Sequence, residues 1–114
     1  MFKFERLEVW KKAVETYELI SEETFKINQK DQYSLGEQIR RSSLSISTNI
    51  AEGTGRNSSK EAKYFFNIAK GSVYETVSLL VIMKKRGYLE EEKFREFYNI
   101  CDEIAMMLSG LMNK

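Results

Sequence analysis

Apolar residues recur at steps of three, four or five over most of the chain, the spacing that traces one face of an α-helix. The pattern predicts four helices, over residues 7–26, 34–52, 58–86 and 90–112. Because the segments between them are short, successive helices must run antiparallel. We therefore expect an all-α fold, an antiparallel up-down-up-down four-helix bundle, as a single domain over residues 1–114.

Each predicted helix has an apolar stripe that should face the core. In the first helix it comprises Leu7, Trp10, Val14, Tyr17, Ile20 and Phe25, and in the second Leu35, Ile39, Ser42, Ile46 and Ile50. In the third it comprises Ala62, Phe65, Phe66, Ala69, Ser72, Val73, Thr76, Leu80 and Met83. In the fourth it comprises Phe94, Phe97, Cys101, Ile104, Leu108 and Leu111.

Local signals mark the helix ends. Ser58 followed three residues later by Glu61 is a capping box that begins the third and longest helix. Gly87 should end that helix, and Gly53 should end the second in a left-handed conformation. Gly71 lies within the third helix, where it costs stability relative to alanine, so we expect close contact with a partner helix there. The second helix is rich in serine, a poor helix former, and should therefore pack inside the bundle.

Two runs of five apolar residues, 79–83 and 104–108, cover the whole circumference of their helices. A single bundle buries only one face of each helix, and water would meet the rest unless another chain covers it. A few exposed apolar residues are normal on any protein, but two such runs favour a homo-oligomer. The expected interface comprises Leu79, Val81, Ile82, Met106 and Met107.

Composition narrows the class of protein. The chain has 114 residues, 42% hydrophobic and 31% charged, with no proline and six glycines, which disfavours loop-rich sandwiches and barrels. The only cysteine, Cys101, cannot form an internal disulfide or a cysteine-cluster zinc site. There is no signal-peptide-like apolar block and no uninterrupted apolar run near the ~18 residues of a membrane span. We expect a cytoplasmic protein that does not contact a membrane.

The chain contains no histidine. This removes the commonest general base, every histidine-paired nucleophile and the histidine ligands of di-iron bundles. Glu52 and Glu61 flank one turn, where carboxylates usually cap helices or stay solvated. Cys101 lies on an apolar stripe and should behave as a small buried hydrophobe. We expect no enzyme activity, catalytic residue, metal or cofactor.

Residues 53–60, Gly-Thr-Gly-Arg-Asn-Ser-Ser-Lys, superficially resemble a phosphate-binding loop. They lack the second glycine of that motif and follow a helix instead of a strand. A helix stop, a tight turn and an N-cap explain the segment better. The alternative is an anion held at the start of the third helix, helped by Arg56 and Lys60.

Basic residues suggest two further patches. The run 84–86 at a helix C-terminus complements the helix dipole, yet the topology places it at the same end as Lys26 and Lys30. Asp31 and residues 90–92 would partly cancel that charge. Arg41 should lie near the height of Lys70 on the antiparallel helix, so Arg40, Arg41 and Lys70 are candidates for one basic patch. The interpretation that we favour is that one arginine pairs with Glu37 or Glu75 and fixes helix packing.

Several blocks resemble the family of four-helix-bundle proteins encoded by intervening sequences within bacterial 23S ribosomal RNA genes. They are Leu7–Ala13, Tyr33–Ser43, Ser45-Ile46, Asn49–Gly53, Gly55-Arg56, Ser58, Glu61, Ile68–Ser72 and Glu75. The chain departs from the family pattern where Ser47 and Lys26-Ile27 replace frequent prolines, which should leave straighter, less sharply bounded helices.

The resemblance implies a left-handed bundle, assembly into a homopentamer and a link to RNA. A similar bundle serves as the accessory protein of a reverse transcriptase in diversity-generating retroelements. Our main hypothesis is a non-enzymatic oligomer that binds RNA, or DNA, with phosphate contacts from Arg40, Arg41, Arg56, Lys60, Lys63 and Lys70. The alternative is a protein-interaction scaffold, such as a reverse-transcriptase accessory subunit.

Overall fold

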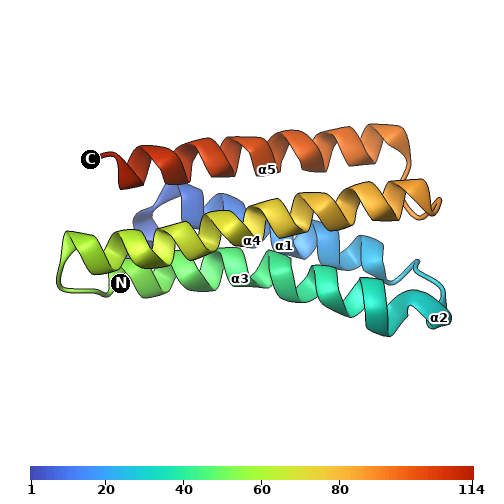
Figure 1. Ribbon diagram of the computed structural model, residues 1–114, viewed down its shortest axis with the longest axis horizontal. Helices are drawn as coiled ribbons and strands as arrows, with labels where there is room; N and C mark the ends of the chain where they lie inside the picture. The colour runs from blue at the N-terminus through green and yellow to red at the C-terminus, as the bar shows by residue number, and fades with distance from the viewer.

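The computed structural model describes residues 1–114, and four long antiparallel helices make up most of it (Figure 1). These are α1 (Glu8–Thr24), α3 (Glu37–Thr54), α4 (Ser59–Lys85) and α5 (Glu91–Met112). A 3-10 turn, η1 (Lys3–Arg6), precedes α1. The short helix α2 (Gln29–Asp31) and the π-helical turn η2 (Gln32–Gly36) connect α1 to α3. The structure confirms the predicted four-helix bundle, which measures 44 × 23 × 23 Å.

Each long helix packs against two neighbours. α3 lies against α1 and α4, and α5 lies against α4 and α1, which closes the ring of four. Both chain termini and the α3–α4 turn lie at one end of the bundle (Figure 1). The α1–α3 connection and the α4–α5 turn lie at the other end. This arrangement decides which basic side chains can act together.

The inward faces of α3, α4 and α5 are largely those predicted, and most of the named residues are buried. The face predicted for α1 is only partly right, since Ile20 is buried and Leu7 and Trp10 pack against the edge of the core. The buried residues of α1 are Val9, Ala13, Thr16, Ile20 and Thr24, whereas Leu7, Trp10, Val14 and Tyr17 are half-buried and Phe25 is 74% exposed. Threonine suits this core because its hydroxyl bonds to its own helix, as Thr16 Oγ1 does to the carbonyl of Lys12 at 2.7 Å.

The serine-rich helix α3 is packed between two neighbours, as predicted. Hydroxyl pairs cross the α3–α4 contact, Ser42 with Thr76 and Ser72 with Ser45, both at 2.9 Å. No buried side-chain polar atom lacks a hydrogen-bond partner. Small hydroxyl residues therefore let the helices approach closely while every polar group stays satisfied.

The ends of α4 are confirmed, since the Ser58 hydroxyl accepts from the backbone N–H of Glu61 at 3.1 Å and Gly87 has φ +82°. The predicted left-handed stop at Gly53 is wrong. Gly53 is buried within α3, and a Cβ there would lie 2.6 Å from the ring of Phe66, so the glycine makes room for a neighbour. The expected close contact at Gly71 is also wrong within this chain, because a Cβ there would meet nothing within 4 Å.

By length and composition, α4 could span a membrane, although it contains no long uninterrupted apolar run. One such helix is weak evidence, because a core helix of a soluble bundle meets the same criterion. The inward residues of α4 are buried against the neighbouring helices.

Candidate nucleic-acid interface

The α3–α4 turn places three of the predicted phosphate-binding residues together. Arg56 follows the last turn of α3, and Lys60 and Lys63 lie in the first two turns of α4. The Arg56 guanidinium pairs with Glu52 at 2.6 Å and lies 4.4 Å from the centre of the Phe65 ring, which joins the end of α3 to α4. Lys60 and Lys63 have no ion-pair or side-chain hydrogen-bond partner, so their ammonium groups are available to a ligand.

η1 adds cations at the same end. It packs against α1 and α3, and neither Lys3 nor Arg6 has an ion-pair partner. We call this surface the turn end and define it by five residues, Lys3, Arg6, Arg56, Lys60 and Lys63. Three carboxylates, those of Glu5, Glu52 and Glu61, belong to the same segments, so the turn end keeps a net positive charge.

Arg40 lies at the opposite end of the bundle and is partly buried. Its Nη1 donates to the Thr24 hydroxyl at 2.7 Å and to the Gln32 side-chain oxygen at 3.3 Å. The Gln32 amide nitrogen in turn donates to the carbonyls of Thr24 and Ile27, at 2.7 and 2.9 Å. Arg40 thus ties α3 to the end of α1 through neutral partners, and pairs with neither Glu37 nor Glu75.

Arg41 pairs with Glu37 at 3.0 Å, one of the two arrangements that the sequence left open. Lys70 points toward α5, where its ammonium donates to the Ser109 hydroxyl at 2.9 Å. The hydroxyl pairs between α3 and α4 place Arg41 level with about residue 76, roughly 9 Å along the axis from Lys70. Arg40, Arg41 and Lys70 therefore do not form one patch, and their contacts with phosphate remain predictions.

The basic residues expected beside the α4–α5 turn do lie at that end of the bundle, and neighbouring carboxylates neutralise part of their charge. Arg86 pairs with Asp31 at 2.9 Å, and Lys84 pairs with Glu91. The Tyr88 hydroxyl donates to Asp31 at 2.5 Å and, together with Arg86, holds the pKa of that carboxyl below its usual value. This end has less free positive charge than the turn end.

The predicted oligomer interface is only partly exposed in one chain. Ile82 and Met106 are 41% and 65% exposed, while Leu79, Val81 and Met107 pack partly against the core. The Lys70–Ser109 contact sets Met106 level with about residue 73, roughly 14 Å along the axis from Ile82. The five residues thus do not form one continuous patch in a chain, and the interface remains a prediction.

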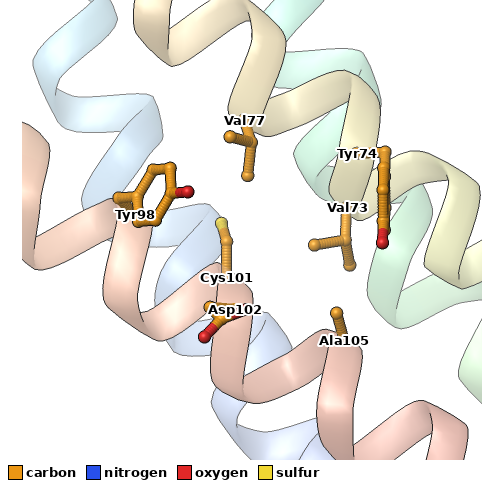
Figure 2. A pocket seen from close by; sticks show the side chains of 7 residues that line it. All are labelled: Val73, Tyr74, Val77, Tyr98, Cys101, Asp102 and Ala105. Atoms are coloured by element: carbon orange, nitrogen blue, oxygen red, sulfur yellow. The ribbon is translucent and has the colours of Figure 1, made fainter.

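Between α4 and α5 lies an apolar pocket of about 200 Å³ (Figure 2). Val73, Val77, Cys101 and Ala105 line it, with Tyr74, Tyr98 and the Asp102 carboxylate beside it (Figure 2). Burial raises the pKa of the Cys101 thiol to about 12, as expected of a cysteine that acts as a small hydrophobe. No group of three or more histidine, cysteine or carboxylate side chains is placed to hold a metal ion.

The partners of Arg40 were missed from the sequence, although Thr24 carries a usable signal. It continues the spacing of Ala13, Thr16 and Ile20 along one face of α1, which marks it as buried. A buried threonine close to an arginine-bearing helix is a candidate hydrogen-bond partner. The role of Gln32 depends on η2, whose π-helical geometry has no comparable sequence signal.

The model of a family described as 23S rRNA-intervening sequence protein matches residues 5–110. The fold is similar to the crystal structure of a protein of unknown function from the S23 ribosomal protein family of Bacteroides thetaiotaomicron, with a TM-score of 0.85 and 26% identity. The similarity covers 93% of this chain and 99% of that one. No curated protein matches the chain.

Proposed function

Because the chain belongs to the 23S rRNA-intervening sequence protein family, we propose that it is a non-enzymatic homo-oligomer that binds RNA through the turn end. The observation that carries this proposal is the set of unpaired cations there. Lys60 and Lys63 lie on the first turns of α4, beside the exposed ring of Tyr64. Free ammonium groups attract phosphates, and an exposed aromatic ring offers a surface on which a base can stack.

Oligomerisation would strengthen binding by repeating the turn end around a symmetric assembly. The net charge of one chain is only +1, so a single copy attracts nucleic acid weakly. Linked copies raise the effective concentration of each site for a bound strand. The family resemblance favours five copies, with contacts through Leu79, Val81, Ile82, Met106 and Met107.

Charge reversal at the turn end tests RNA binding. The double variant Lys60→Glu, Lys63→Glu should bind a labelled, unstructured RNA at least about tenfold more weakly in fluorescence anisotropy at low salt. Losing two phosphate contacts should also reduce the slope of log affinity against log salt by about 1 to 2. Lys85→Glu is the control, because Lys85 is exposed and unpaired but lies at the other end. Equal RNA affinity of the double variant and the wild type would refute the proposal.

Light scattering tests the oligomer separately. Ile82→Asp and Met106→Asp place a charge on exposed positions, so each chain should fold while the assembly dissociates. Leu44→Asp is the matched control, since Leu44 on α3 is 44% exposed and lies outside the proposed interface. A wild-type protein with the mass of one chain would contradict the assembly.

The alternative is a scaffold that presents a surface to a protein such as a reverse transcriptase. The apolar α4–α5 pocket favours it, because such a pocket suits a side chain from a partner. A wild-type protein that binds no RNA at low salt, but retains a polymerase through this pocket in a pull-down, would support the scaffold over the RNA-binding role. Tyr98→Arg should abolish that retention.

A further inference from the structure

A second hollow lies at the end of the bundle opposite the turn end, where α1, η2 and α3 meet. Its volume is about 450 Å³, and Phe25, Tyr33, Arg40, Gln29 and Glu37 contribute to its lining. Phe25 and Tyr33 are 74% and 80% exposed, far more than the other aromatic residues of α1 and α3 and their connection. Two exposed rings beside a polar hollow are characteristic of a binding surface.

The guanidinium of Arg40 is held in place at this hollow. Its contacts with Thr24 and Gln32 use Nη1 alone, which leaves N–H groups on Nε and Nη2 free. It also lies 5.9 Å from the centre of the Phe25 ring. Gly36 allows this arrangement, because a Cβ there would lie 2.8 Å from the Gln32 oxygen and 3.3 Å from Arg40 Nη1.

We propose that this hollow binds an unpaired base of a single-stranded RNA, an inference that rests on the RNA-binding function proposed above. Phe25 and Tyr33 supply stacking surfaces for the faces of the base. Arg40 donates to ring nitrogen and carbonyl acceptors on its edge, and Glu37 Oε2, the carboxylate oxygen that Arg41 does not contact, accepts from an amino group. Lys30, next to Gln29 in the chain, is exposed and unpaired, and is available to the adjacent phosphate.

The chemistry of the lining favours a base over an apolar partner. Arg40 has no carboxylate partner, so an apolar group seated here would remove its charge from water without compensation. A base carries hydrogen-bonding groups on its edge and an aromatic face, and therefore matches both the guanidinium and the rings.

Stacking variants separate this site from the turn end. Phe25→Ala and Tyr33→Ala should each weaken binding of a short unstructured RNA by about 5- to 150-fold, the effect of losing one stacked base. Neither variant should change binding of an abasic ribose-phosphate chain of the same length, or the salt slope, because no phosphate contact is lost. Tyr33→Phe keeps the ring and should bind as the wild type does. Leu44→Ala controls for the loss of an exposed apolar side chain.

The outcomes distinguish the two proposals. If wild-type protein binds RNA and loses affinity in Lys60→Glu, Lys63→Glu but not in the Phe25 and Tyr33 variants, the base site is refuted and the RNA-binding function stands. Equal affinity of wild-type protein for RNA and the abasic chain refutes the base site in the same way. If Tyr33→Ala changes the mass in light scattering, the hollow is a subunit contact and the inference is wrong. Absence of any wild-type RNA binding refutes both.

Discussion

Replacing Gly53 by alanine tests the close packing of α3 against α4. A Cβ at this position would lie 2.6 and 2.8 Å from two carbons of the Phe66 ring and 3.1 Å from the backbone oxygen of Ala62. The ring is only 7% exposed and the carbonyl belongs to α4, so neither can move freely. The helices must separate or the ring must leave its rotamer.

The magnitude follows from two opposing terms. Overpacking a core usually costs about 1–3 kcal/mol. Alanine in place of a glycine within a helix raises the free energy of unfolding by about 0.5–1 kcal/mol. We therefore expect Gly53→Ala to lower the free energy of unfolding by about 1–2 kcal/mol, which corresponds to a drop in Tm of roughly 4–8 °C in a domain of this size.

Urea titration followed by far-UV circular dichroism measures this effect. Gly71→Ala is the matched control, since Gly71 also lies within a helix but its Cβ would meet nothing within 4 Å. That variant should gain about 0.5–1 kcal/mol. If Gly53→Ala unfolded at the same urea concentration as the wild type or a higher one, glycine would not be required for the packing of α3 on α4.

Three further predictions concern the Arg40–Thr24 hydrogen bond between α3 and α1 (the α1–α3 anchor), the Cys101 thiol and the stability of the fold at acidic pH. Thr24→Val removes the oxygen that accepts from Arg40, and should cost about 1–3 kcal/mol in urea unfolding; an unchanged midpoint would show that the anchor contributes nothing. Cys101, with its pKa raised to about 12, should not react with a thiol reagent at pH 8 in the folded protein and should react in urea; rapid labelling without urea would contradict its burial. The lowered pKa of Asp31 stabilises the fold above the ordinary pKa of 3.8, and this contribution is lost as pH falls through the lower folded value. Asp31→Asn should therefore be less stable than the wild type near neutral pH, and the difference should shrink below about pH 4; a difference independent of pH would show that ionisation of Asp31 does not stabilise the fold.

The fold could be predicted well because the spacing of the apolar residues and the capping residues at the helix ends indicate the same helices. Ser58 and Gly87 mark the ends of α4 through local backbone chemistry that does not depend on neighbours. The two errors about glycine have a common physical reason. The sequence shows that a side chain is absent at Gly53 and Gly71, but only the packing of α4 on α3 shows whether the space is used.

The candidate site was harder to predict, because charge along a helix does not reveal its partners. Lys60 and Lys63 could be expected to lie together from their spacing on one helix. Arg40 lies far from Lys70 because each turns toward a different neighbouring helix. The register of α3 on α4, which the serine and threonine hydroxyls fix, sets the axial distance between Arg41 and Lys70 and cannot be counted from the turn alone.

The contact between the first and last long helices has a consequence for synthesis. One flank of α1 is covered by α3 and the other by α5, so the bundle stays open along one side until α5 has left the ribosome. A nascent chain that has reached only Gly87 therefore carries an uncovered apolar seam, and a stall at that point should make it a target for chaperones.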